Sequence, residues 1–350
     1  MKQFIVLCVL SVLTVNCFAQ TRPFVGAYYF DGWATSGYNS HLTKKLVNNF
    51  NNRKPVWGWA TSNQSVINAQ IDAAADAGLS FFSFCWYYNA HKNIDSTNRA
   101  LMFYNCSPLK SRLKFCLLVA NHMPYEIGPA EWPAVTNEWL KQFKAGNYVV
   151  VDGKPLLIFF SVQSLIKKFG SEANVKAVFD AFKQQAKHAG ITGITIAACL
   201  GAGRTEVSAA ANCGFDVLTG YNYSPVGFIK NQTSIPIDNL QKGEINAWNQ
   251  FPKVTNLPCI PLVTLNWDPR PWAEGNNYYT TTPYYTGYSK QSVYTSVSNA
   301  IAWSRSHQAD VTRENIIILY AWNEYGEGAW LTPGANGHTE LLDGLKSALK

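Results

Sequence analysis

Hydrophobic and polar positions alternate along this chain in blocks, with short apolar runs separated by longer segments that mix polar and apolar residues. Most of the runs are too continuous for strands with one face in water, so they predict strands buried on both faces. The eight predicted strands are 24–30, 79–86, 113–120, 155–160, 191–200, 215–221, 258–267 and 316–322.

Several of the intervening segments repeat apolar residues with the period of a helix. One such stripe carries Ile67 and Ile71 and closes on Gly78, a residue suited to a helix C-terminus. Another begins at Ser171, a good N-cap, and ends at Gly190. The four predicted helices are 65–78, 171–190, 291–304 and 340–349.

Eight strands alternating with helices over about 330 residues predict an α/β fold of the (β/α)8 TIM barrel type. We expect a single domain, 20–350, with long loops on its catalytic rim. The longest polar stretches, 33–63 and 269–289, follow the first and seventh strands and would lie on that rim. A doubly wound open sheet is the alternative, but Asp31-Gly32-Trp33 follows the first strand where that fold favours a glycine-rich phosphate loop.

The N-terminus has the pattern of a secretory signal peptide at 1–19. Lys2 supplies the positive charge, 4–15 the apolar stretch, and Cys17-Phe18-Ala19 the small-x-small cleavage site. We therefore expect a secreted or periplasmic protein. Lipid anchoring at Cys17 is the alternative, although Thr14-Val15-Asn16 is a poor approach to a lipidated cysteine. No later run reaches the ~20 apolar residues that span a bilayer, so no integral membrane segment is expected.

Composition narrows the class of ligand. The net charge is +7, but the basic residues are scattered, which argues against a nucleic-acid partner. Only 15% of residues are charged, while 14% are Phe, Trp or Tyr. Low charge with many aromatic rings suits a neutral sugar better than a phosphate, although aromatic residues also fill large cores.

Six cysteines follow the predicted signal peptide. Export permits disulfides, yet Cys85, Cys116, Cys199 and Cys259 each lie in an apolar run, where a free buried thiol is the ordinary explanation. The chain contains no C-x-x-C and no H-E-x-x-H, and its six histidines are dispersed. We therefore expect neither a metal site nor a cofactor.

The segment 320–330, Y-A-W-N-E-Y-G-E-G-A-W, carries the strongest chemical signal. Glu324 and Glu327 follow the last predicted strand, and Gly326 and Gly328 allow the backbone to turn sharply. Two carboxylates at the end of a buried strand, surrounded by aromatic rings, are the groups that glycosidic hydrolysis needs. The alternative is an acidic turn after an edge strand, where two neighbouring tryptophans would be unusual.

In a barrel, residues at the C-terminal ends of the strands face the active site. The fourth predicted strand ends in Phe160-Ser161 with no acid, so the pair Glu324 and Glu327 is the candidate for catalysis. His122 could contact substrate or be a satisfied loop histidine. The predicted substrate-binding residues are Tyr29, Asp31, Trp33, Trp86, Tyr87, Tyr88, Asn121, His122, Tyr221, Tyr223, Trp267, Asp268, Arg270 and Asn323.

Three segments carry a resemblance to a known family: V-G-A-Y-Y-F-D-G-W near the start, A-A-D-A-G-L-S-F-F-S-F-C-W-Y-Y, and A-W-N-E-Y-G-E-G-A-W-L-T-P near the end. In this order they resemble the WbsX-like proteins, relatives of glycoside hydrolase family 99 and, more distantly, family 71. The resemblance spans nearly the whole mature chain. It implies a (β/α)8 barrel with endo-α-mannosidase or endo-α-mannanase activity.

The family 99 motif after the eighth strand is N-E-W-x-E, and Glu324 and Glu327 match its two acids. The resemblance implies that Glu324 deprotonates the substrate's own 2-hydroxyl, giving a 1,2-anhydro sugar, while Glu327 protonates the leaving oxygen, with overall retention. Tyr325 stands where tryptophan is usual, and Gly326 where family 99 tends to have histidine. These departures keep both acids but leave mannose specificity open, and some WbsX-like members are labelled glycosyltransferases.

The combined prediction is a secreted, retaining, endo-acting glycoside hydrolase on an α-linked polysaccharide or glycan, with a mannan-type substrate favoured. Its partner would be a polysaccharide or oligosaccharide, and a monomer is expected. The alternatives are a non-catalytic glycan-binding protein on the same barrel and a glycosyltransferase. The predicted site residues should converge on one cleft, with Asp31 and Asp268 near a sugar between the acids. A carboxyl separation of ~6.5–9.5 Å is expected, because attack through the 2-hydroxyl needs room.

Overall fold

The computed structural model describes residues 23–33, 41–60, 63–88, 98–202 and 206–350. The predicted signal peptide, 1–19, and the alternative anchor Cys17 lie outside these ranges. Of the helices within them, none combines the length and the apolar character that crossing a bilayer requires.

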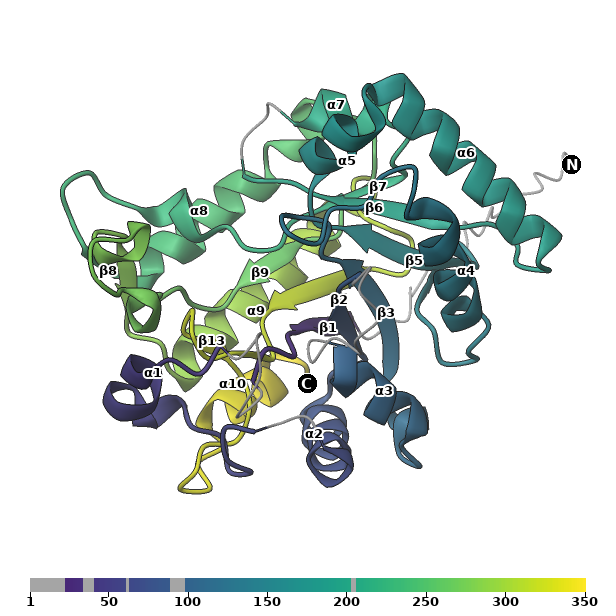
Figure 1. Ribbon diagram of the computed structural model, residues 1–350. Helices are drawn as coiled ribbons and strands as arrows, with labels where there is room; N and C mark the ends of the chain where they lie inside the picture. The colour runs from purple at the N-terminus through teal and green to yellow at the C-terminus, as the bar shows by residue number, and fades with distance from the viewer. Residues whose placement is uncertain (1–22, 34–40, 61–62, 89–97, 203–205) are drawn as a thin grey trace, which may run out of the picture.

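Eight parallel strands form a barrel with helices around it (Figure 1). Their order around the barrel is β7-β6-β5-β3-β2-β1-β11-β9. The ring closes where the Leu218 amide donates to the Pro258 carbonyl at 3.0 Å and the Ile260 amide to the Leu218 carbonyl at 2.8 Å. The predicted (β/α)8 fold is confirmed. The strands are β1 (Phe24–Tyr29), β2 (Phe81–Trp86), β3 (Lys114–Val119), β5 (Lys154–Phe159), β6 (Thr195–Cys199), β7 (Val217–Thr219), β9 (Leu262–Thr264) and β11 (Ile316–Tyr320).

Seven of the barrel strands lie inside the predicted runs, and β5 begins one residue before its run, at Lys154. The agreement follows because the runs are buried between the barrel interior and the outer helices. All five residues of β11 are buried, for example. The run 258–267 is strand only at β9, since its later residues leave the sheet toward the catalytic rim. Five further short strands are described: β4 (Val150–Val151) pairs with β5, β8 (Ser234–Pro236) with β10 (Tyr284–Thr286), and β12 (Asn323–Glu324) with β13 (Ala329–Trp330).

The four helices predicted from the sequence are all present, as α2, α6, α9 and α10. Their ends follow the expected capping chemistry: the Ser171 side chain accepts from the Asn174 amide, and Gly78 closes α2 with a φ of 98°. The described helices are α1 (Lys44–Asn49), α2 (Gln64–Ala77), α3 (Arg99–Cys106), α4 (Trp132–Phe143), α5 (Val162–Phe169), α6 (Glu172–His188), α7 (Val207–Asn212), α8 (Ile237–Trp248), α9 (Lys290–Ser306) and α10 (Glu340–Ala348).

Short 3-10 helices occupy several of the connections, and two of them shape the catalytic rim. The segment η1 follows α1, and η6 follows the exit of β9. The described 3-10 helices are η1 (Asn51–Arg53), η3 (Lys110–Arg112), η4 (Ser224–Gly227), η5 (Phe251–Lys253), η6 (Arg270–Trp272) and η7 (Tyr278–Thr280).

The cysteines between residues 85 and 259 carry free thiols, which confirms the buried-thiol interpretation for those in apolar runs. Cys85, Cys116, Cys199 and Cys259 are buried, and burial raises the pKa of the Cys116 and Cys199 thiols to about 12. These side chains therefore act as small apolar groups in the core.

A buried carboxyl lies behind the seventh barrel strand. Glu244 of α8 is 1% exposed, and one of its oxygens accepts from the Thr264 amide of β9 at 2.5 Å. Its other oxygen has no hydrogen-bond partner among the described residues. Burial raises the pKa of Glu244 to about 8. The protonated form is therefore favoured in the folded protein.

We expect Glu244→Gln to stabilise the protein progressively as the pH rises. The folded-state pKa of Glu244 lies above its unfolded value, so its contribution is fully present below about pH 4.3 and is lost as the pH rises toward 8. The advantage of the neutral amide should grow by about 1.4 kcal/mol per pH unit in that window. Urea unfolding of both proteins at pH 5, 6.5 and 8 measures it, and a pH-independent difference would contradict it.

Candidate active site

The predicted acid pair lies on a small antiparallel hairpin beyond the last barrel strand. After β11, Asn323 and Glu324 form β12, which pairs with β13 in the register Asn323 to Trp330 and Glu324 to Ala329. The Asn323 side chain fixes this hairpin to β1, because its amide oxygen accepts from the Phe30 amide and its nitrogen donates to the Phe30 carbonyl. Glu327 lies in the turn of the hairpin, three residues beyond Glu324.

Glu324 is the deeper of the two acids and is 4% exposed. The Tyr221 hydroxyl donates to its Oε1 at 2.5 Å. Burial raises the pKa of Glu324 to about 7, while this hydrogen bond opposes the shift by stabilising the carboxylate. Glu324 therefore changes its protonation state close to neutral pH.

Glu327 is partly exposed and lies on the same cavity as Glu324. The Tyr320 hydroxyl, at the end of β11, contacts its Oε2. Desolvation raises the pKa of Glu327 to about 8. Of the two acids, Glu327 thus holds its proton to the higher pH. Environments that separate the pKa values of neighbouring acids are typical of acid–base sites.

A cavity of 640 Å³ opens over the two acids. Its remaining walls combine aromatic rings, two histidines and a third carboxyl, so it is both apolar and rich in hydrogen-bonding groups. The residues that line it are Phe30, His41, Thr43, Cys85, Tyr87, Leu118, Ala120, His122, Phe160, Tyr221, Trp272, Glu274, Asn277, Tyr279, Glu324 and Glu327.

Five residues predicted from the sequence line this cavity: Tyr87, His122, Tyr221, Glu324 and Glu327. They come from the ends of four different barrel strands, as the fold prediction requires. The Nδ1 of His122 is 2.9 Å from the Met123 carbonyl, so only its other ring nitrogen is available for a ligand at the cavity.

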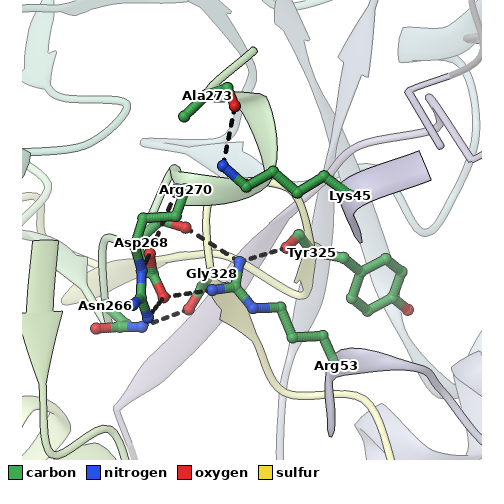
Figure 2. A network of polar contacts seen from close by, with 8 residues as sticks. All are labelled: Lys45, Arg53, Asn266, Asp268, Arg270, Ala273, Tyr325 and Gly328. Carbon is green, nitrogen blue, oxygen red and sulfur yellow. Dashed lines mark hydrogen bonds and ion pairs between the residues drawn. The ribbon is translucent and has the colours of Figure 1, made fainter. Parts of the chain in front are cut away.

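Sequence reasoning did not single out the cavity residues on the long rim loops. His41 and Thr43 come from the loop after β1, and Trp272, Glu274 and Tyr279 from the loop after β9. Both loops had been assigned to the catalytic rim by their length and position. The two loops are joined, since Thr43 Oγ1 donates to the Pro271 carbonyl at 3.1 Å. In addition, Lys45 Nζ donates to the Ala273 carbonyl at 2.9 Å (Figure 2).

Several aromatic residues predicted to bind substrate do not line the cavity. Tyr29, Trp33 and Tyr223 are at most 1% exposed, and Trp86 and Trp267 are 7% exposed. They lie in the expected region, but neighbouring side chains cover them: Trp86 packs between Trp139 and Tyr88, for example. Tyr88 is partly exposed yet is also outside the cavity lining. These six predicted residues therefore do not line this cavity.

Three predicted polar contacts hold the scaffold instead of facing the cavity. Asp31 accepts from the Ala100 amide in α3 at 2.5 Å. Asn121 exchanges hydrogen bonds with the backbone of Ser161, and Asn323 does the same with Phe30. All three predicted residues are at most 2% exposed. Their side chains join the ends of adjacent elements and do not line this cavity.

Asp268 and Arg270 lie behind the acid hairpin, outside the cavity lining. The Asp268 carboxylate is ion-paired with Arg53 at 2.5 Å and with Arg270 at 2.7 Å (Figure 2). Both predicted residues face a second cavity of 770 Å³, which Arg53, Asn266 and Trp330 also line. The expectation that Asp268 hydrogen-bonds a sugar between the two glutamates does not fit this position.

Gly326 gives an aromatic ring room to lie against the acid hairpin. A side chain at this position would overlap the six-membered ring of Trp272, because the indole packs directly on the glycine. Trp272 in turn stacks on Trp33, with centroids 6.4 Å apart and an interplanar angle of 11°. The indole thus forms a cavity wall that packs on Gly326, the residue before Glu327.

The described residues contain no group of three or more His, Cys, Asp or Glu side chains arranged to hold a metal ion. The side chains that line the cavity include three carboxyls and several phenol hydroxyls. A protonated and an ionised carboxyl beside phenol groups can transfer protons to and from a bound ligand.

The solved structures with similar folds include glycoside hydrolases. A glycoside hydrolase-like protein matches with a TM-score of 0.66 and 16% identity, covering 94% of each chain. A GH99 endo-α-mannosidase from Bacteroides thetaiotaomicron matches with a TM-score of 0.62 and 13% identity, covering 93% of this chain and 95% of that one. The structure of a GH99 endo-α-mannosidase from the same organism in complex with BIS-TRIS-propane matches with a TM-score of 0.59 and 14% identity. That match covers 89% of this chain and 87% of the other. These likenesses show a glycoside hydrolase-type fold.

A search of curated proteins returned no match. A family model does match, over residues 59–344, which takes in seven of the eight barrel strands and the acid hairpin. Its description is glycosyltransferase WbsX. On the extent of that match, the chain belongs to the WbsX family.

Proposed function

We propose that the protein is a retaining, endo-acting hydrolase of α-linked glycans, with Glu324 and Glu327 as its catalytic pair. The observation that carries the proposal is the pair itself. Two carboxyls with raised pKa values, one buried and one partly exposed, lie on one cavity, each beside a tyrosine hydroxyl. Hydrolysis of a glycosidic bond needs one acid to protonate the leaving oxygen and one base to assist attack.

The charge of the cavity favours hydrolysis over transfer from a nucleotide sugar, the activity in the family's name. Glu274, Glu324 and Glu327 line the cavity, whereas no Lys or Arg does so among the described residues. A nucleotide sugar carries a diphosphate, which needs cations or helix N-termini to hold its negative charge. Three carboxyls without a cation suit a neutral sugar. Turnover of a panel of nucleotide sugars by the purified protein would contradict this part of the proposal.

The match of Glu324 and Glu327 to the two acids of the family 99 motif supports their roles, and the direction of their pKa shifts agrees with them. Glu327, with a pKa of about 8, keeps its proton at neutral pH and donates it to the leaving oxygen. Glu324, with a pKa of about 7, is the base and takes the proton of the substrate's 2-hydroxyl. The 2-oxygen then bonds to the anomeric carbon as the glycosidic bond breaks, and water opens the resulting 1,2-anhydro ring. Two inversions give net retention. The carboxyl separation of ~6.5–9.5 Å stays a prediction.

The pH dependence of kcat/KM should be a narrow bell. Glu324 must be ionised, so the rate should rise as the pH rises through about 7. Glu327 must be protonated, so the rate should fall as the pH rises through about 8. The optimum is therefore expected between pH 7 and 8, provided that these groups titrate in the free enzyme. Initial rates from pH 5 to 10 measure it, and an optimum near pH 5 would contradict this assignment.

The substrate class is the finer part of the proposal. Rings of Tyr87, Tyr221, Trp272 and Tyr279 border the acids on several sides, and flat rings bind the apolar faces of sugars. The fold likeness to an endo-α-mannosidase favours an α-mannan or a mannose-containing glycan. The proposal extends to export through the N-terminal signal and to a monomer in solution.

A substrate panel tests the activity. The mature chain is incubated with α-mannans, α-glucans and mannose-rich glycans, and products are separated by size. Release of oligosaccharides from one class, with Glu324→Gln and Glu327→Gln inactive under the same conditions, is the expected result. Release of single sugars only would overturn endo action. Absence of products across all three classes would remove the support for hydrolysis of α-linked glycans.

A further inference from the structure

The turn that carries Glu327 is held from behind by donors that lie outside the catalytic cavity. We infer that Arg53 and Asn266 are positioning residues for Glu327, fixing the backbone on both sides of it while its side chain projects into the cavity. The kinetic consequence of this inference depends on the proposed function, but the positioning itself does not.

Arg53 reaches the hairpin from η1, about 270 residues earlier in the chain. Its Nη1 donates to the Tyr325 carbonyl at 2.8 Å and to the Asp268 carbonyl at 3.0 Å, while its Nη2 donates to the Asp268 carboxylate at 2.5 Å (Figure 2). One guanidinium thus joins the exit of β9 to the turn between the two acids. Its planar array of donors makes several contacts from one fixed group.

Two further donors act on the other side of Glu327. The Asp268 amide donates to the Glu327 carbonyl itself at 2.7 Å, and Asn266 Nδ2 donates to the Gly328 carbonyl at 2.6 Å. The carbonyls of residues 325, 327 and 328 are therefore all held by one group of donors. At Gly328 the packing is close, because a side chain there would come within 2.9 Å of Asp268 Cβ.

Glu324 has a separate set of supports. It belongs to the paired strand β12, its carboxylate accepts from Tyr221, and its neighbour Asn323 is bound to Phe30. Weakening the contacts of Arg53 should therefore disturb Glu327 more than Glu324. This asymmetry separates a positioning role from a general contribution to stability.

Arg53 remains charged in its buried position. It is 3% exposed, and although burial lowers the pKa of Arg53 to about 10, the side chain is protonated at neutral pH beside Asp268. The Asp268 carboxylate has Arg270 as a second partner, so replacing Arg53 with lysine leaves no uncompensated charge. Lysine keeps the positive charge but loses the fixed fork that reaches two carbonyls at once.

The test compares Arg53→Lys and Asn266→Ala with wild type and with the control Arg112→Lys. Arg112 also pairs with two carboxylates, of Asp72 and Asp76, but does so on the exposed surface. The first readout needs no activity: the carboxyl carbons of ¹³C-labelled glutamate are titrated by NMR, with Glu327→Gln used for assignment. Glu244, buried elsewhere with a pKa of about 8, serves as an internal reference.

We expect both variants to lower the pKa of Glu327 by about one unit or more, because a loosened turn admits water, with Glu244 unchanged. The second readout is kcat/KM. For glycan substrates kcat/KM should fall about 10²-fold, the loss expected when a catalytic group is misplaced by about 1 Å. For an activated aryl glycoside, which needs less help from the acid, the loss should be less than about tenfold. Asn266→Ala keeps the test decisive if Arg53→Lys does not fold.

The outcomes separate the two claims. If Glu327 has the same pKa in the folded variants as in the wild-type protein, the positioning role is overturned, even if glycan hydrolysis is established. Equal losses for both leaving groups would do the same, since general destabilisation has no leaving-group dependence. A selective pKa change in a protein that hydrolyses nothing would support the positioning role and count against the proposed function.

Discussion

Replacing Glu327 with glutamine is expected to slow glycan hydrolysis by about 10²–10⁴-fold and to leave an activated aryl glycoside far less affected. The reason is that an alkoxide leaving group needs a proton in the transition state, whereas a nitrophenolate or a similar anion leaves without one. Glutamine keeps the size and polarity of the side chain at the cavity but has no acidic proton. The measurement is kcat/KM for both substrate types at the pH optimum.

Glu324→Gln is the matched comparison, because it removes the other acid of the same pair. It should lose a similar factor for both substrates, since the base is needed whatever the leaving group. Retained folding is checked through unchanged thermal unfolding at pH 5, where both glutamates are protonated in the folded protein. Rescue of Glu324→Gln but not of Glu327→Gln by the aryl substrate would reverse the assigned roles.

Gly326→Ala should produce the second large loss, on the order of 10²-fold in kcat/KM, without removing any catalytic group. Its methyl group would occupy the space of the Trp272 ring, so either the indole or the acid turn must shift. The rigid backing of Trp272 by Trp33 makes a small adjustment costly. Kinetics on the preferred glycan and the intrinsic fluorescence of the tryptophans measure the two consequences.

The control for this change is Gly146→Ala. Gly146 has open space where its side chain would go, and its backbone is not in the left-handed region. The same glycine-to-alanine change is therefore expected to leave kcat/KM within about twofold, as for most surface substitutions. Full activity in Gly326→Ala would show that Trp272 can move freely, which contradicts its role as a fixed wall.

The barrel could be predicted from the sequence because its strands are buried on both faces and therefore appear as uninterrupted apolar runs. The acid pair could be located for a related reason, since Glu324 and Glu327 directly follow such a run. Helices α4 and α8 escaped prediction. In α8 the buried stripe is interrupted by Gln241 and Glu244, which are buried beside partners from other elements.

The substrate-contacting residues were harder to predict, because position at a strand end does not fix which way a side chain faces. Trp33 and Trp272 are both tryptophans of the rim, yet Trp33 is covered and Trp272 lines the cavity. The sequence predicts that the Asp268 carboxylate faces the catalytic rim, but in the structure it is ion-paired with Arg53 behind the acid hairpin. The two paired residues are more than 200 positions apart in the chain, so no local sequence pattern predicts that they interact.

The central claim is that the cavity over Glu324 and Glu327 binds and cleaves a glycan, and a crystal structure of Glu327→Gln with a soaked oligosaccharide tests it most directly. The account predicts a sugar chain across the 640 Å³ cavity, with a glycosidic oxygen in hydrogen-bonding reach of residue 327 and a 2-hydroxyl in reach of Glu324. A sugar bound only in the cavity beside Asn266 and Trp330, with the acids unoccupied, would contradict it.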